Sequence, residues 1–440
     1  MTQTHSAADL AMERDWLSAA ALQIAGELQD AGYDGYLVGG CVRDLLLGRR
    51  PKDFDITTDA SPEEVRRLFR RSRIIGRRFQ LVHVRLGREV IEVATYRAKP
   101  DGARARGGRG NSAAVAADGR VIDDNAFGTI EQDAARRDFT INSLYYDPRR
   151  DCVLDFAGGV RDARKRVLRM IGEPRARFTE DPVRMLRALR FRAKLDLEWE
   201  RGLPPAIAEC RDFLASVPPP RLFDETLKMF HHGHARKSWE ELRAHGLAAT
   251  LFPPAFDADG NAPEKLIGMA LDNTDERVRH GKPVIAAFLF AVLLWMPFKR
   301  ELARAARGLP HAEAVWAAGD AVFASQSLRV AVPRRVAVAA MEIWQMQFAL
   351  EARKPRAVAR LLGERRFRAA FDFLLLRARI GEVEAALAEW WEEIQECGED
   401  ETRRRIEALR PRRARSASSG GNERRAGRRA RHAPAAALNK

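Results

Sequence analysis

The pattern of apolar residues changes near Gly158, and this change limits the class of fold. In residues 35–155, short runs rich in β-branched and aromatic residues alternate with stretches of helical character. After Gly158 such runs become sparse, and apolar residues recur with the helical period of about 3.6 between prolines. The sequence therefore predicts an α+β domain followed by an all-α region.

Local signals place several elements of the first half. Ser61-Pro62-Glu63-Glu64 matches a capping box, which predicts a helix reaching about Phe69. Two alternating runs, 80–86 and 90–96, predict a hairpin that turns at Gly87-Arg88. We also expect short strands at 36–38 and 54–57 and a helix at 42–47.

Charge points to the kind of partner. The 440 residues include 76 Lys and Arg against 61 Asp and Glu, a formal net charge of +15. Clustered cations gain free energy by releasing the counterions of a nucleic acid, so a polyanion partner is favoured. The last 30 residues hold eight Arg, one Lys and one Glu, supply +8 of this charge, and are expected to be disordered. The Gly-, Ala- and Arg-rich segment 99–119 is expected to be a mobile loop.

Other features exclude several classes of protein. The longest apolar run, 284–296, has 13 residues, short of the ~20 that cross a bilayer, and predicts a buried helix. The first 16 residues contain acidic side chains and no apolar core of a signal peptide, which favours the cytoplasm. The cysteines lack the spacing of zinc ligands or of a disulfide framework, so free buried thiols are expected at Cys41, Cys152, Cys210 and Cys397.

A Gly-Gly pair marks a candidate anion site. Gly39 and Gly40 lie between an expected strand and an expected helix, where backbone N–H groups can approach a phosphate. Arg43, in the first turn of that helix, could clamp the same phosphate. An ordinary turn is the simpler interpretation of the glycines alone. Dinucleotide binding is disfavoured because the G-x-G-x-x-G spacing is missing.

Carboxylates follow at a spacing that suits a metal. Asp53 and Asp55 project to one face if residues 53–56 form a strand. Such a pair is stabilised by a divalent cation, and oxygen ligands suit Mg²⁺ in phosphoryl transfer. A solvated pair in a turn is the simpler alternative. A third carboxylate could be Glu92, which lies among apolar strand residues, or Asp138, and the sequence leaves this choice open.

Four motifs occur along residues 30–230. Gly-Gly-x-Val-Arg-Asp begins at Gly39, Asp-x-Asp at Asp53, Arg-Arg-Asp-Phe-Thr-Ile-Asn at Arg136, and Glu-Asp-Pro-Val-Arg-Met-Leu-Arg at Glu180. Together they resemble the class II nucleotidyltransferase family, which comprises bacterial poly(A) polymerases and CCA-adding tRNA nucleotidyltransferases. The resemblance implies transfer of AMP from ATP to the 3′ end of RNA.

The resemblance also implies roles for individual residues. Asp53 and Asp55 are implied to bind two catalytic Mg²⁺ ions, and Asp138 is implied to act at the catalytic centre. Glu92 stays a further catalytic candidate because of its place among apolar strand residues. The implied nucleotide-binding residues are Gly39, Gly40, Arg43, Arg137, Asn142, Asp181, Arg184 and Arg187.

Three of these, Asp181, Arg184 and Arg187, resemble the protein template that the family uses to select the nucleotide. Pro182 predicts a helix that begins there and has Asp181 as its N-cap. Arg184 and Arg187 are three apart and so share one helix face, where two guanidinium groups can contact a base. A solvated basic face is the simpler alternative.

Two features favour poly(A) addition over CCA addition. Segment 74–84 resembles one that separates poly(A) polymerases from their CCA-adding relatives, and its Arg77, Arg78 and Phe79 suit RNA backbone and a stacked base. A plain basic turn is the alternative. The basic C-terminus adds sequence-independent affinity for RNA, and segment 354–379 resembles the arginine-rich C-terminal region of poly(A) polymerases. The alternatives are a CCA-adding tRNA nucleotidyltransferase and a non-catalytic RNA-binding protein, which would not need the four carboxylates.

The expected architecture is α+β: a nucleotidyltransferase head with a small mixed sheet, all-α neck, body and C-terminal regions, and a basic tail. We expect a helical extension at 1–29, the catalytic head at 30–160 and the neck, with template and RNA-binding regions, at 161–260. The helical body and C-terminal region follow at 261–400, and the tail at 401–440. The expected partners are ATP, Mg²⁺ and RNA 3′ ends, and no membrane.

Overall fold

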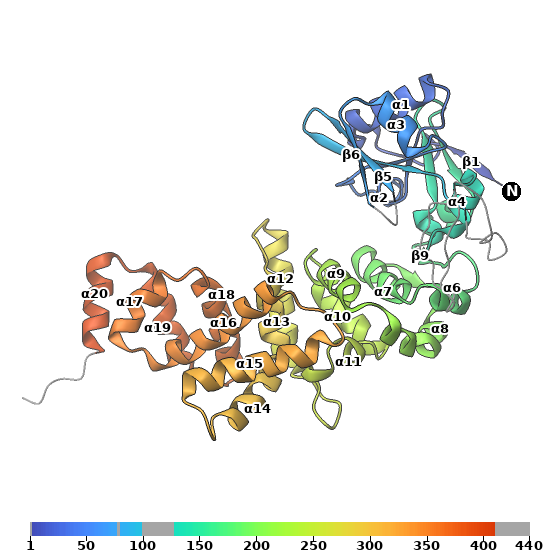
Figure 1. The fold of residues 1–440 in the computed structure, drawn as a ribbon. Coiled ribbons are helices and arrows are strands. Elements are labelled where there is room, and N and C mark those ends of the chain that lie inside the picture. The colour runs from blue at the N-terminus through green and yellow to red at the C-terminus, as the bar shows by residue number, and fades with distance from the viewer. Residues whose placement is uncertain (1, 77–79, 99–126, 410–440) are drawn as a thin grey trace, which may run out of the picture.

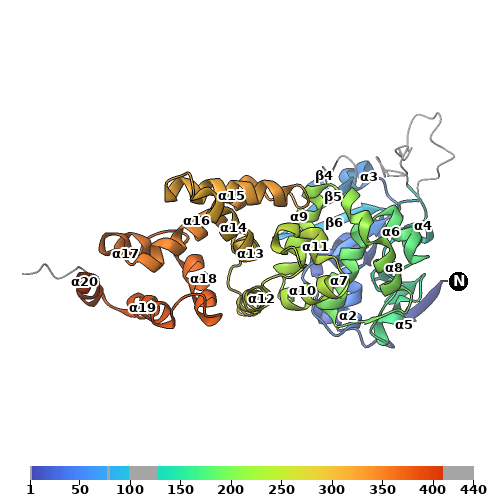
Figure 2. The same cartoon turned by 90° about the horizontal axis from the view of Figure 1, so that it is seen from below.

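The computed structural model describes residues 2–76, 80–98 and 127–409. An α+β head, coloured blue to teal, lies above one end of an elongated array of helices (Figure 1). Seen from below, the head overlaps helices α6 to α11, while α12 to α20 extend away from it (Figure 2). The predicted mixed head followed by an all-α region is confirmed. The expected loop at 99–119 and the tail beyond residue 409 lie outside the described residues.

The described residues of the head form a mixed sheet of eight strands in the order β1-β8-β7-β2-β3-β6-β5-β4. Within it, β3 and β6 are parallel and the other neighbours antiparallel. The strands are β1 (Gln3–Ser6), β2 (Tyr36–Val38), β3 (Asp55–Thr58), β4 (Ser72–Ile75), β5 (Leu81–Leu86), β6 (Glu89–Thr95), β7 (Leu144–Asp147) and β8 (Cys152–Asp155). The predicted hairpin is confirmed as β5 and β6. A separate parallel pair joins β9 (Val167–Leu168) to β10 (Glu198–Trp199).

Helices cover the apolar face of this sheet. They are α1 (Ala19–Asp30), α2 (Gly40–Leu46), α3 (Pro62–Leu68) and α5 (Gly159–Arg164), whereas α4 (Ile130–Arg136) packs on the other face, where Ala134 clusters with Val38 and Tyr145. Ile24 of α1 and Val65 of α3 belong to one buried cluster with Ile56 and Val93 of the central strands. The predicted capping box of α3 is present, with the Ser61 amide donating to Glu64 Oε2 at 2.7 Å. The core thus lies on one side of β3 and β6, and their other side is available for function.

Two expectations about the head are corrected. Residues 1–29 are not a separate helical extension, because Gln3–Ser6 pairs with β8 and α1 packs in the head core. Strand β3 begins at Asp55, so Asp53 precedes the strand. The alternation nevertheless continues across this boundary: Phe54 and Ile56 are buried, while Asp53 and Asp55 are exposed. The two carboxyl groups therefore still project away from the core.

The remaining helices form the neck and the body. They are α6 (Pro174–Glu180), α7 (Val183–Leu195), α8 (Leu203–Cys210), α9 (Pro219–Phe230), α10 (Ala235–Ala244), α11 (Ala248–Leu251), α12 (Glu264–Arg279), α13 (Ala286–Leu293), α14 (Trp295–Ala305), α15 (His311–Ser327), α16 (Arg334–Ala352), α17 (Pro355–Leu362), α18 (Phe367–Arg379), α19 (Ala385–Glu396) and α20 (Glu399–Ala408). One apolar cluster runs from Phe139 to Ile394, so neck and body share a core that begins at the edge of the head.

Several predictions from the sequence concern this helical region and the state of the cysteines. The apolar run at 284–296 forms α13 and the start of α14 and is largely buried, as predicted. Across the described ranges, no helix combines the length and apolarity that crossing a bilayer requires. The cysteines are free, but Cys397 is partly exposed rather than buried. Helix α20 also occupies 399–408, so the expected disordered tail does not begin at residue 401.

Candidate active site

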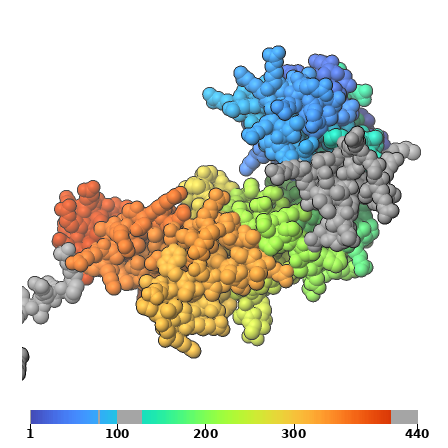
Figure 3. Space-filling view, viewed as in Figure 1, coloured from blue at the N-terminus to red at the C-terminus, as the bar shows by residue number. Residues whose placement is uncertain are grey.

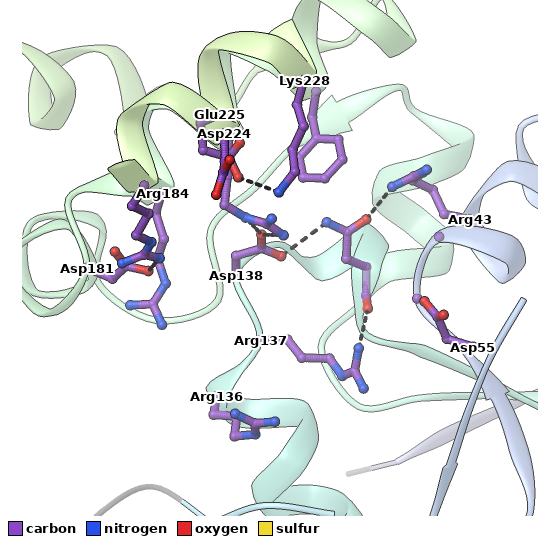
Figure 4. A pocket seen from close by; sticks show the side chains of 16 residues that line it. Arg43, Asp55, Arg136, Arg137, Asp138, Asp181, Arg184, Asp224, Glu225 and Lys228 are labelled. Atoms are coloured by element: carbon purple, nitrogen blue, oxygen red, sulfur yellow. Dashed lines mark hydrogen bonds and ion pairs between the residues drawn. The ribbon is translucent and has the colours of Figure 1, made fainter. Parts of the chain in front are cut away.

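A cleft of about 590 Å³ opens where the head meets the neck (Figure 4). The head contributes the β2–α2 turn, the first residue of β3 and the segment that follows α4, while α7 and α9 of the neck close the opposite side. The cleft is lined by Gly39, Gly40, Arg43, Asp55, Arg136, Arg137, Asp138, Asn142, Asp181, Arg184, Arg187, Phe191, Arg221, Asp224, Glu225 and Lys228. Ten of the residues predicted from the sequence are therefore gathered in one cavity.

The glycine turn forms one wall of the cleft. Gly39 has φ +76°, a conformation that side chains other than glycine rarely adopt, and it directly precedes α2. A Cβ atom on Gly39 would lie 3.5 Å from Nη1 of Arg137. The two glycines thus keep the cleft wall at the start of α2 free of side chains beside a guanidinium, while the Gly39 N–H donates to the carbonyl of Leu144 at 3.1 Å.

Arg43 is held in place rather than free. Its Nε and Nη2 donate to Oδ1 of Asp44 at 2.8 and 2.6 Å, and its Nη1 donates to Oδ1 of Asn142 at 2.7 Å. The guanidinium lies 5.2 Å from the ring centre of Phe191 on α7, and the residue is only 4% exposed. Arg43 therefore connects the head to the neck, and the phosphate clamp expected of it is not free in this arrangement.

Asp138 uses both of its carboxylate oxygens within the protein. Oδ1 accepts from the Phe139 amide at 2.8 Å and from Nδ2 of Asn142 at 3.1 Å, and Oδ2 accepts from Nε of Arg187 at 2.7 Å. Burial alone would raise the pKa of Asp138, but the Arg187 guanidinium and these hydrogen bonds outweigh burial and lower it. Asp138 thus stays ionised and fixes Arg187 of α7.

Arg137 belongs to a similar buried network. Its Nη2 donates to Oδ2 of Asp133 at 2.9 Å and its Nε to the hydroxyl of Tyr145 at 3.0 Å. Burial would lower the pKa of Arg137, but Tyr145 and Asp133 raise it above its ordinary value. The guanidinium therefore keeps its charge at the edge of the cleft.

The residues that resemble a nucleotide template are each paired with a residue outside that set. Asp181 Oδ2 accepts from Nη2 of Arg221 on α9 at 2.7 Å, and Nη1 of Arg184 donates to Oε2 of Glu180 at 2.7 Å. Helix α7 begins at Val183, one residue later than predicted. The pairing leaves each side chain oriented before a ligand binds.

The joint between head and neck passes through this site. Arg177 on α6 is 3% exposed and donates to the backbone carbonyls of Arg136 and Arg137 at 2.5 and 2.6 Å. The amide of Ile171, in the connecting segment, donates to the carbonyl of Asp138 at 2.9 Å. The end of α4 and the start of the neck are therefore bonded directly to each other.

The carboxylates of the sheet lie on the other side of the cleft. Asp55 on β3 is opposite Glu92 on β6, and Glu92 Oε1 lies 3.1 Å from Nε2 of His83. Although Asp55 is exposed toward the open cleft, the surrounding protein partly desolvates its carboxyl group and raises its pKa to about 6. Repulsion from Glu92 and Asp53 adds to the shift, and Arg137 opposes it. Such mutual repulsion is relieved by a cation, and this set of hard oxygen donors fits Mg²⁺.

Two predicted carboxylates, Asp53 and Glu92, do not line the cleft itself. In the described part of the chain, no three His, Cys, Asp or Glu side chains already converge as a metal site. The predicted RNA-binding residues Arg77, Arg78 and Phe79 lie outside the described ranges.

Sequence reasoning missed the contribution of α9. Arg221, Asp224, Glu225 and Lys228 recur at the spacing i, i+3, i+4, i+7, which places them on one helix face. Figure 4 shows Asp224, Glu225 and Lys228 above the cleft. This polar stripe was readable from the sequence. Arg136 is the first residue of the motif Arg-Arg-Asp-Phe-Thr-Ile-Asn, but the sequence assigned no role to it. Phe191 also lines the cleft, although its apolar character predicts only packing.

Comparisons with known proteins agree with this geometry. Residues 35–169 match the family described as poly A polymerase head domain, 205–259 the probable RNA and SrmB-binding site of polymerase A, and 307–432 the polymerase A arginine-rich C-terminus. Poly(A) polymerase I of Salmonella typhimurium is 42% identical over 422 residues, covering 92% of this chain and 89% of the relative. The CC-adding tRNA nucleotidyltransferase of Halalkalibacterium halodurans is 37% identical over 226 residues, covering 51% and 52%.

A solved structure shares the fold. The crystal structure of the Bacillus stearothermophilus CCA-adding enzyme in complex with CTP superposes with a TM-score of 0.56 and 26% identity, covering 88% of this chain and 82% of that one. The fold is thus that of nucleotidyltransferases of this class. Within the class, the chain belongs to the poly(A) polymerase family, since that match extends over 92% of the chain and the CC-adding match over 51%. The resemblance inferred from the four motifs is confirmed.

Proposed function

We propose that this chain transfers AMP from ATP to the 3′ hydroxyl of RNA, repeatedly and without a nucleic-acid template, in the cytoplasm. The observation that carries the proposal is the cleft itself, in which carboxylates of the head face fixed guanidinium groups of the neck. The RNA 3′ oxygen forms a bond to the α-phosphorus of ATP. The bond from that phosphorus to the bridging oxygen breaks, pyrophosphate leaves, and the hydroxyl proton passes to solvent.

We assign cation binding to Asp53, Asp55 and Glu92. When bound there, Mg²⁺ supplies positive charge that lowers the pKa of the attacking hydroxyl and neutralises the triphosphate. Glu92 is preferred over Asp138 as the third carboxylate because it is the register partner of Asp55. Asp138 is already bonded to Arg187, Asn142 and the Phe139 amide, so we assign it a positioning role.

The nucleotide is assigned to the space between the glycine turn and α7. The Gly40 N–H and the Arg137 guanidinium can bind the triphosphate, whereas the Gly39 N–H already donates to the carbonyl of Leu144 at 3.1 Å. Asp181 and Arg184 can hydrogen-bond the base. Because these side chains are already oriented by ion pairs, little reorganisation opposes nucleotide binding.

An incubation of the full chain with generic RNA, Mg²⁺ and each nucleoside triphosphate tests the proposal. We expect long homopolymers with ATP, measured as a ladder on a sequencing gel. A parallel reaction contains tRNA that lacks its 3′ CCA, with CTP and ATP. Three additions followed by arrest would instead identify a CCA-adding enzyme. No incorporation on either substrate, with RNA binding retained, would identify a non-catalytic RNA-binding protein.

A further inference from the structure

The strand register places a row of side chains from the active site to the edge of the sheet. Asp55 on β3 is opposite Glu92 on β6, Glu92 is opposite His83 on β5, and His83 is opposite Arg73 on β4. Residues directly opposite each other project to the same face. Since neighbouring strands are about 4.8 Å apart, this row spans about 14 Å. Arg73 therefore lies on the same face as the catalytic carboxylates.

A second row runs beside the first. Val90 on β6 is opposite Arg85 on β5, and the Arg85 amide donates to the carbonyl of Arg71 at 2.9 Å. Arg71, Arg73 and Arg85 are exposed. Among the described residues, none of the three forms an ion pair with an Asp or Glu side chain. Val90 and Ile75 are 51% and 38% exposed. This face thus combines unpaired cations with accessible apolar side chains.

The opposite face of the same strands is closed. Val65 and Phe69, at α3 and its end, belong to one buried cluster with Val82, Val84 and Val93. In the space-filling view the blue head overhangs an open notch on the side of the yellow helix α12 (Figure 3). Of the residues on β4 and β5, none lines the nucleotide cleft. The basic rows therefore approach Asp55 from the side that the nucleotide does not use.

We propose that Arg71, Arg73, Arg85, Val90 and Ile75, here called the sheet track, bind single-stranded RNA just upstream of its 3′ end. The inference deepens the proposed function and rests on it, since it assigns a place to the RNA strand whose end is extended.

Two contrasts support the sheet track. The guanidinium groups of Arg184, Arg187 and Arg221 are paired with carboxylates and fix a geometry, whereas those of the sheet track are unpaired and attract phosphates of any sequence. Exposed aliphatic side chains between cations suit ribose and base surfaces, which also bind without regard to sequence. An enzyme that extends varied 3′ ends needs such tolerance.

The test measures RNA affinity without nucleotide, so that binding is separated from catalysis. The full chain, Arg73→Ala/Arg85→Ala and Arg66→Ala/Arg67→Ala are titrated against fluorescent oligo(A) at several salt concentrations. Arg66 and Arg67 are exposed on α3, on the opposite side of the same strands, and give the matched charge control.

We expect the sheet-track variant to bind RNA about tenfold more weakly, with a salt slope shallower by about 1.4 from the loss of two phosphate contacts. In extension assays its KM for RNA rises while its KM for ATP is unchanged. The α3 variant should match the wild type.

Equally weakened RNA binding in the sheet-track variant and the α3 variant, or unchanged RNA binding in both, would overturn the inference. A wild-type chain that binds RNA through the sheet track but incorporates no AMP would overturn the proposed function alone.

Discussion

The two sides of the active-site cleft hold charge in opposite ways. On the neck side, guanidinium groups lie against carboxylates, as in the pair of Arg187 with Asp138 at 2.6 Å. On the head side, Asp55 lies next to Glu92 and Asp53, and no described Lys or Arg forms an ion pair with it. The pKa of Asp138 is lowered, whereas that of Asp55 is raised to about 6. On the neck side the charges are balanced within the protein. On the head side the repulsion between carboxylates would be relieved by a bound cation.

Substitution of Asp55 gives the sharpest test of this comparison. We expect Asp55→Asn to reduce AMP incorporation by about 10³-fold, because it removes a carboxylate that holds the cation. RNA affinity should be unchanged or slightly higher, since a negative charge is lost near the RNA. Single-turnover incorporation and RNA titration measure the two effects. Glu63→Gln, an exposed acid on α3, is the control, and retained incorporation in Asp55→Asn would remove the metal assignment.

Substitution of Asp138 should act mainly on stability. Asp138→Asn leaves Arg187 without its counterion, so we expect a loss of about 3 kcal/mol in the free energy of unfolding. Asp196→Asn removes an exposed partner of Lys237 and should change the free energy of unfolding much less, because solvent screens an exposed ion pair. Urea unfolding of both variants decides the matter. Similar unfolding midpoints for the two variants would mean that the buried Asp138–Arg187 pair contributes no more to stability than the exposed Asp196–Lys237 pair.

The smallest effect concerns pH. The folded pKa of Asp55, about 6, lies above the unfolded value near 3.9, so the folded chain binds more protons between these values. Its carboxyl group therefore lowers stability as pH rises from about 4 to about 6, with no further change above.

Relative to wild type, Asp55→Asn should be equally stable near pH 4 and more stable at pH 7 by roughly 1 kcal/mol, allowing for solvent screening of an exposed group. Adding Mg²⁺ should reduce this difference in stability at pH 7, because the cation stabilises the ionised Asp55 of the wild type. Unfolding midpoints of the wild type and Asp55→Asn at several pH values measure the difference in stability. If that difference did not change with pH, the raised pKa of Asp55 would be contradicted.

The family and most residues of the cleft could be predicted from the sequence, because residues such as Gly39, Asp55 and Arg187 lie within short contiguous motifs. It could not separate Glu92 from Asp138. That choice depends on partners from distant elements, such as Arg187, which is 49 residues from Asp138, and on the β3–β6 register. Strand β1 was missed because its sequence, QTHS, has no apolar alternation, and its pairing with β8 defines it.

The bonds from Arg177 define the part of the chain that can be exchanged between relatives. The carbonyls of Arg136 and Arg137, at the end of α4, receive their donors from a helix of the neck. A head cut after residue 160 would leave these carbonyls without that donor and would expose Phe139, which packs with Phe191 of α7. A chimera with another family member should therefore transfer the head together with α6 and α7, so that the crossover falls beyond Leu195 rather than at the apparent end of the sheet.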